Sequence, residues 1–141
     1  SRDNARSPMT WNSGSKAGFT TGRPWLPLND EYPNLNVETE TEDENSVLNY
    51  YKNLIKLRKQ YPALIEGDYE ELLSYSPGIY AYARTTKDKS ERIIVIANTT
   101  AKIRGYKIPE LKGATLLAST YGNREATLLR SYEVRVYKVK K

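Results

Sequence analysis

The spacing of apolar residues changes once along this 141-residue chain, close to Pro62. Before that proline, over 45–61, apolar residues recur every three or four positions, which predicts an amphipathic helix that the proline ends. From Gly67 onward they alternate or form short blocks between turn residues, which predicts strands. One helix followed by strands indicates an α+β chain, which we divide into two parts, 1–66 and 67–141.

The predicted helix has an apolar stripe and a basic side. Asn45 or Ser46 can cap its start. The stripe contains Val47, Leu48, Tyr51, Leu54, Ile55 and Leu57, and the basic side contains Lys52, Lys56 and Lys59. Basic amphipathic helices also bind membranes or calmodulin-like partners, but a helix that packs against a parent domain is the favoured interpretation. We therefore predict no membrane partner.

About seven short strands are predicted after the helix, which is typical of an all-β antiparallel sandwich. The candidate segments are 68–75, 78–85, 92–98, 102–108, 114–119, 125–129 and 132–140. In the last of these, alternation predicts that Val134 and Val136 face inward, whereas Arg135 and Lys138 face outward.

The segment 1–44 is dense in glycine, proline and asparagine, which favours turns over regular structure. It also carries apolar side chains that a disordered linker would not need, so we expect an ordered loop that lies on another surface. These anchors are Met9, Trp11, Phe19, Trp25, Leu26, Leu28 and Tyr32. The acidic run 38–44 is interpreted as a solvated approach to the helix start.

Composition excludes several kinds of chemistry. The chain has no Cys and no His, so disulfides, thiolate metal sites and imidazole bases are absent. Its 22 basic and 17 acidic residues give a net charge of +5, but acids are interleaved with the basic residues, so nucleic-acid binding is not predicted. No metal or cofactor motif and no apolar stretch of membrane-spanning length is present, so we expect no cofactor and a cytoplasmic location.

The opening sequence SRDNARSPMTW places Arg2 and Arg6 four residues apart around Asp3 and Asn4. One interpretation is a structural network in which the aspartate pairs with an arginine and the asparagine closes a turn. The other is that a guanidinium binds an oxygen-rich ligand while its neighbour orients a carboxylate. The residue types alone favour the structural interpretation.

Five collinear segments carry a family resemblance: SRDNARSPMTW at the start, AGFTTGRPW at 17–25, NVETE at 36–40, SVLNYYKNLIKLRKQYPAL at 46–64 and GDYEEL at 67–72. Together they resemble the C-terminal part of glycoside hydrolase family 13 enzymes. The narrower resemblance is to the oligo-1,6-glucosidase group, which includes dextran glucosidase, trehalose-6-phosphate hydrolase and sucrose isomerases. Ser7 and Thr10 depart from the group's usual RTPMQW, and beyond 72 only the strand pattern supports the resemblance.

The resemblance implies the last loop and helix of a (β/α)8 barrel, followed by a C-terminal β domain. The catalytic Asp and Glu and the transition-state-stabilising Asp would all precede this chain, so no catalytic residue is assigned within it. Arg6 matches the family arginine that helps to hold the terminal hydroxyl of the non-reducing glucose. Arg2 matches a second arginine of the same pocket, and Asp3 and Asn4 would support the loop.

We therefore expect a fragment of a retaining, exo-acting α-glucosidase that binds α-1,6-linked gluco-oligosaccharides through its parent barrel and is inactive alone. Without the barrel, the helix stripe should fold onto the β domain, self-associate, or leave 1–44 disordered. The alternatives are a sucrose isomerase fragment, a trehalose-6-phosphate hydrolase fragment, or a stand-alone carbohydrate-binding module. The module is suggested by eight tyrosines in 67–141, although tyrosines such as Tyr80 and Tyr82 are first of all cross-strand packing residues.

Overall fold

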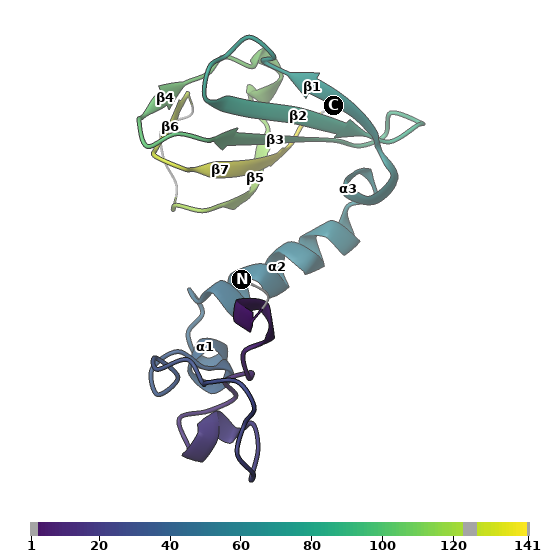
Figure 1. Cartoon of the computed structure of the whole chain (residues 1–141). Helices are drawn as coiled ribbons and strands as arrows, with labels where there is room; N and C mark the ends of the chain where they lie inside the picture. Colours follow the sequence, from purple (N-terminus) through teal and green to yellow (C-terminus); the bar gives the residue numbers. More distant parts are fainter. Residues whose placement is uncertain (1–2, 123–126, 141) are drawn as a thin grey trace. The chain divides into compact units, whose positions relative to one another are not determined.

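The computed structural model describes residues 3–122 and 127–140. The chain divides into two compact units, Ser1–Ile55 and Lys56–Lys141, with the boundary inside the longest helix. The first unit contains two short 3-10 helices, Asp3–Arg6 and Ser15–Gly18, and the helix α1 (Val37–Glu42). Figure 1 shows these elements joined by long loops. The dominance of loops agrees with the prediction for 1–44.

The helix α1 lies in the acidic run that we interpreted as a solvated approach. It begins because Asn36 and Thr39 form a capping box: each side chain accepts a hydrogen bond from the other residue's backbone N–H, at 3.0 Å and 3.3 Å. Glu38 and Glu40 in its first turn suit the positive end of the helix dipole. The acidic charges alone therefore did not indicate a helix, whereas the Asn36–Thr39 cap does.

The helix α2 (Val47–Gln60) confirms the predicted amphipathic helix, and Ser46 caps it by accepting the backbone N–H of Asn49 at 3.1 Å. No residue of α2 is buried, and Val47 on the apolar stripe is 77% exposed. A short helix, α3 (Ala63–Glu66), follows the proline that ends α2. Within the described part of the chain, no helix is long and apolar enough to cross a membrane.

The second unit contains two antiparallel sheets (Figure 1). The larger sheet has the strand order β1-β2-β3-β7-β5, and the smaller one pairs β4 with β6. The strands of the larger sheet are β1 (Asp68–Leu72), β2 (Ile79–Thr85), β3 (Arg92–Asn98), β5 (Thr115–Ser119) and β7 (Val134–Lys138); those of the smaller are β4 (Arg104–Gly105) and β6 (Leu128–Leu129). A 3-10 helix, Pro109–Leu111, joins β4 to β5. The α+β class and the antiparallel sheets are confirmed.

The core of the second unit lies on both faces of the larger sheet. On one face, buried side chains of β2 and β3 such as Ala83 and Ile96 pack with Leu129 of the smaller sheet. On the other face, Ile93 and Val136 pack with Ala63 of α3. Coverage on both faces explains why β3 is an unbroken apolar run rather than an alternating one.

One prediction for the last strand is wrong. Arg135 was expected to face outward, but it is only 2% exposed and lies on the same side of the sheet as the main core. Its neighbours Val134 and Val136 face the opposite side, toward the cluster that contains α3. The arginine is tolerated inside because Glu133, also buried, pairs with it at 2.6 Å.

Candidate functional site

Arg6 is the predicted sugar-binding residue that the structure describes. It is the last residue of the first 3-10 helix, its side chain is exposed, and its guanidinium makes no hydrogen bond or ion pair with any other described residue. Pro8, two residues later, is buried, and its ring fixes the φ angle of the backbone at that position. The guanidinium of Arg6 is therefore available to a ligand.

The other predicted residues of this motif are only partly described. Arg2 lies outside the described residues, as does the side chain of Asn4, whereas Asp3 is described and exposed. The structure therefore does not test whether the two arginines meet. Asp3 does have an interaction with another residue, and its role in supporting the loop stays a prediction.

The loop that carries Arg6 is anchored to α1 by backbone hydrogen bonds. Val37 donates to the carbonyl of Thr10 at 2.9 Å, and Glu38 donates to that of Trp11 at 3.0 Å. Further along, the backbone folds back, with Trp11 donating to the carbonyl of Ala17 at 2.8 Å. These bonds join the opening motif to the start of the helical region.

Glu40 and Asn49 hold α1 and α2 together. The Glu40 carboxylate accepts the backbone N–H of Leu48 at 3.0 Å, near the start of α2. The Asn49 amide donates to the carbonyls of Glu40, Thr41 and Asp43 at 2.8–3.1 Å, which satisfies the exposed end of α1. One carboxylate and one amide thus join the end of α1 to the start of α2. Sequence reasoning missed both residues, because their partners depend on the angle between the helices.

Beside this junction lies an apolar groove of about 340 Å³. We call it the helix groove; it is lined by Met9, Leu35, Asn36, Val37, Glu40, Val47, Leu48 and Tyr51. Several of the lining side chains are open to solvent: Met9 and Leu35 are about half exposed and Tyr51 is 65% exposed. The groove includes part of the helix stripe that we predicted to pack against a parent domain.

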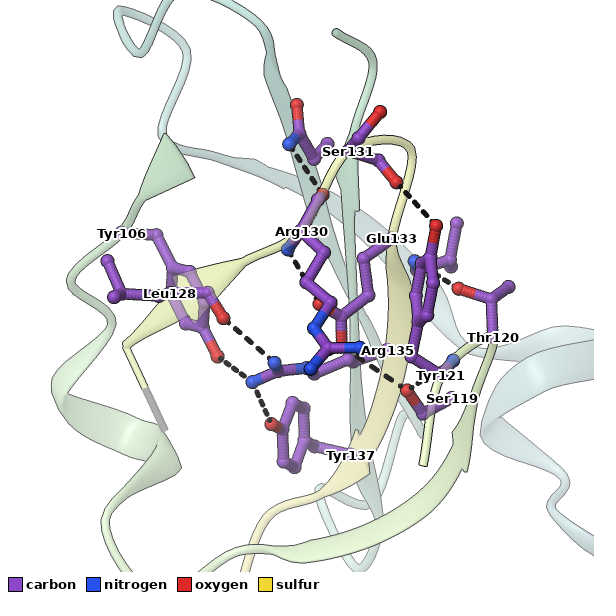
Figure 2. A network of polar contacts seen from close by, with 12 residues as sticks. Tyr106, Ser119, Thr120, Tyr121, Leu128, Arg130, Ser131, Glu133, Arg135 and Tyr137 are labelled. Carbon is purple, nitrogen blue, oxygen red and sulfur yellow. Dashed lines mark hydrogen bonds and ion pairs between the residues drawn. The ribbon is translucent and has the colours of Figure 1, made fainter. Parts of the chain in front are cut away.

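In the second unit, the most organised polar cluster surrounds the buried pair of Glu133 and Arg135 (Figure 2). The Arg135 guanidinium also donates to the carbonyl of Leu128 at 2.8 Å and reaches the hydroxyls of Tyr106 and Tyr137 at 3.5 Å. These contacts connect β7 to the smaller sheet. Both residues lie two apart in the predicted strand segment 132–140, a spacing that places them on one face and could have signalled the pair, although β7 itself begins at Val134.

The carboxylate of Glu133 is held in its charged form. Burial acts to raise its pKa, but the hydrogen bonds from Arg135, from the backbone N–H of Arg130 at 2.7 Å and from the Ser119 hydroxyl lower the pKa below its usual value. A buried carboxylate that stays charged and fully bonded has no proton to exchange with a substrate. We interpret this cluster as structural.

The titratable side chains of the described residues limit the chemistry that they can support. Among them, no group of three or more His, Cys, Asp or Glu residues could hold a metal ion. In the first unit, burial raises the pKa of the Tyr50 hydroxyl, which keeps this side chain neutral. Arg6 gives this unit an exposed guanidinium on the loop that begins the chain.

Comparisons with known proteins agree with this geometry. The alpha-amylase family, described as the alpha amylase catalytic domain, matches residues 1–67. The chain is 44% identical to the oligo-1,6-glucosidase of Parageobacillus thermoglucosidasius over 147 aligned residues, which cover 99% of the chain and 26% of that enzyme. It is 42% identical to the trehalose-6-phosphate hydrolase of Escherichia coli, over 80% of the chain and 20% of that enzyme.

The structural comparison gives the same group. The crystal structure of isomaltulose synthase from Klebsiella sp. LX3 superimposes with a TM-score of 0.84 at 37% identity, over 99% of this chain and 26% of that one. The chain therefore spans about a quarter of the length of the relatives that it matches. The catalytic-domain match ends where the strands begin.

Proposed function

Since the chain belongs to the alpha-amylase family and matches the C-terminal quarter of oligo-1,6-glucosidases, we propose that it is the C-terminal part of an exo-acting α-glucosidase for short α-1,6-linked gluco-oligosaccharides. The observation that carries this proposal is the collinear 44% identity to an oligo-1,6-glucosidase over 99% of the chain. Residues 1–67 would complete the catalytic barrel, and the β sheets would support it.

Within that enzyme, Arg6 and Arg2 would bind the substrate. Active-site loops of a (β/α)8 barrel lie at one end of the barrel, and the loop before its last helix belongs to that end. A guanidinium presents a rigid set of donors that suits sugar hydroxyls and carboxylates. The exposed, unbonded state of Arg6 in this structure supports a role in ligand binding rather than in the loop's own architecture.

The bond-breaking groups would come from the preceding part of the barrel. A retaining glycosidase uses one carboxylate as nucleophile and a second as acid and base, about 5 Å apart. The nucleophile would attack the anomeric carbon while the acid protonates the leaving oxygen, and water would then hydrolyse the glucosyl-enzyme. The 141-residue chain alone should therefore show no activity on isomaltose.

A graft tests this proposal. Residues 1–67 would replace the corresponding residues of the P. thermoglucosidasius oligo-1,6-glucosidase, which keeps its own β domain. We expect the graft to hydrolyse isomaltose. Arg6→Lys in the graft should raise KM roughly 10- to 100-fold, because a charge-assisted hydrogen bond contributes about 1.5–3 kcal/mol.

The matched control is Arg23→Lys, which changes an exposed arginine of the same loop region. This variant should leave KM unchanged. An inactive but folded graft would contradict the proposed activity. An active graft in which the two lysine variants behave alike would contradict the role of Arg6.

A sucrose isomerase is the second candidate, because isomaltulose synthase superimposes over 99% of the chain. The same residues grafted into the Klebsiella enzyme discriminate between the two. We expect the glucosidase graft to retain the larger fraction of its host's activity. Better retention of isomaltulose formation from sucrose would favour the isomerase.

A further inference from the structure

A left-handed turn follows the motif that carries Arg6. Lys16, Ala17 and Gly18 have φ angles of 54°, 55° and 65°, so three consecutive residues lie in the left-handed region. We call these three residues the left-handed turn. Glycine adopts this region freely, but in lysine and alanine the Cβ atom crowds the following carbonyl oxygen. Backbone strain of this kind persists only where surrounding contacts hold it, and it is concentrated at functional sites.

The left-handed turn holds the backbone that follows the arginine motif. The carbonyl of Ala17 accepts two adjacent N–H groups, from Trp11 at 2.8 Å and from Asn12 at 3.3 Å. Ala17 itself has no exposed surface. The direction of its carbonyl is set by the backbone angles of the turn, so a relaxation of these angles would release both donors.

The same backbone is also held by α1. The carbonyls of Thr10 and Trp11 accept N–H groups from the first two residues of that helix, at 2.9 Å and 3.0 Å. Residues 10–12 are thus fixed through their donors by the left-handed turn and through their acceptors by a helix start.

Two side chains fix the shape of the left-handed turn. The Asn12 side-chain oxygen accepts the backbone N–H of Gly14 at 3.0 Å, and a Cβ atom on Gly18 would lie only 2.6 Å from the Asn12 Nδ2. The Lys16 ammonium donates to the carbonyl of Thr21 at 2.5 Å. Glycine is therefore required at 18 for two reasons, its positive φ and the space that the asparagine occupies.

The position of Arg6 depends on this backbone. Only residues 7–9 separate Arg6 from the held segment, and the ring of Pro8 fixes one of their φ angles. The Arg6 guanidinium makes no hydrogen bond or ion pair with any other residue that the structure describes. Among these residues, it is therefore the main chain and not a side-chain contact that places the guanidinium.

We propose that the left-handed turn positions Arg6 for sugar binding, with Lys16 and Gly18 as positioning residues. This inference rests on the proposed function, in which Arg6 binds the substrate. A binding group that is already held in place does not have to be ordered when the ligand arrives, so preorganisation increases affinity. The strained backbone at 16 and 17 is the means by which the turn directs its carbonyl to the segment behind Arg6.

The test uses the graft of residues 1–67 in the P. thermoglucosidasius oligo-1,6-glucosidase. Gly18→Ala should raise KM for isomaltose roughly tenfold with kcat nearly unchanged, because it displaces a group that binds the sugar. The matched control is Gly22→Ala, in the same loop. A Cβ atom there would meet only the Thr20 hydroxyl, at an ordinary 3.7 Å, so both constants should stay unchanged.

A double-mutant cycle separates positioning from general damage to the loop. In the Arg6→Lys graft, the added Gly18→Ala should raise KM less than about twofold, because the group that the turn positions is already gone. A purely structural role would give the same rise in both backgrounds. That result would overturn the inference.

Lys16→Met is a milder second variant. It preserves the length of the side chain but removes the ammonium that bonds the Thr21 carbonyl. KM should rise roughly threefold, as expected for the loss of one hydrogen bond, and this rise should disappear in the Arg6→Lys graft. The control Lys52→Met changes an exposed lysine of α2 and should leave KM unchanged. If the Gly18→Ala graft fails to fold, this pair of lysine variants decides the inference in the same way.

Modification of arginine by phenylglyoxal, mapped by mass spectrometry, gives a measurement that does not depend on turnover. If the graft is inactive, protection of Arg6 by isomaltose that Gly18→Ala abolishes and Gly22→Ala retains would support the inference while contradicting the proposed activity. An active graft in which these two glycine variants behave alike would overturn the inference and leave the proposed function standing. An inactive graft in which isomaltose does not protect Arg6 would contradict both.

Discussion

The two units of this chain handle their large apolar side chains in opposite ways. In the second unit, Ile93, Ile94 and Ile96 of β3 have no exposed surface. In the described part of the first unit, no large apolar side chain is buried, and Trp25 is 84% exposed. Burial of apolar surface is the dominant stabilising contribution in small domains. The second unit thus has a core of its own, whereas the first depends on hydrogen bonds among loops and helix ends.

The largest expected effect is on stability and comes from removing the buried ion pair of the second unit. Arg135→Met leaves the Glu133 carboxylate buried without its counter-charge and should lower the free energy of unfolding by about 3–5 kcal/mol. Urea denaturation of the chain measures it. The control is Arg92→Met, which removes partly exposed pairs with Glu70 and Glu110 at 2.8 Å and 2.7 Å and should cost about 1 kcal/mol or less. Similar losses for both variants would show that the buried pair has no special role.

The next effect compares the two units directly through one type of side chain. Ile96→Ala opens a cavity in a fully buried position and should lower the free energy of unfolding by roughly 2–5 kcal/mol. Ile55→Ala changes a side chain of α2 that is 43% exposed, and should cost about 0.5 kcal/mol. Both are measured by urea denaturation. An equally large loss at Ile55 would mean that the helix stripe is covered in the isolated chain, by the β unit or by a second copy.

A smaller effect concerns pH. Because the pKa of Glu133 is lowered by folding, this carboxylate contributes stability above the range in which an unfolded glutamate titrates, and the contribution is lost as the pH falls through its folded pKa. Urea midpoints of the chain should therefore decline as the pH falls below that range. In Glu133→Gln, stability at neutral pH should be lower and the acid-dependent decline should be shallower. An unchanged decline would assign it to other groups.

The smallest expected effect concerns the cap at the start of α2, in the first unit. Ser46→Ala removes the cap of α2. It should lower the free energy of local opening at the first turn of the helix by about 1 kcal/mol, so the amides there should exchange faster. Amides of β2 and β3 should be unaffected. If they changed as well, the two units would unfold as one. Strong protection throughout 1–44 in a monomeric chain would likewise contradict the view that this unit lacks a stabilising partner.

Much of this architecture could be predicted from local patterns. Three-and-four spacing predicted α2 to within two residues, and the segment predicted as a strand at 92–98 is β3. The helix α1 was missed because Asn36 and Thr39 signal it only when read as a capping pair. Arg6 was found through the family resemblance, whereas Lys16 and Ala17 gave no signal, because neither residue type favours the left-handed region and their φ angles are set by surrounding contacts.

The residue order therefore determined where helices and strands begin and end, since these follow from spacing, caps and prolines within a few positions. Only the folded chain decided which side of each strand is covered. Alternation places Arg135 and Tyr137 on a common face of the sheet. It does not show that this face is covered by the smaller sheet, or that Arg135 pairs there with Glu133 instead of facing water. That outcome depends on segments tens of residues away, because burial of a charge is tolerated only where a distant partner satisfies it.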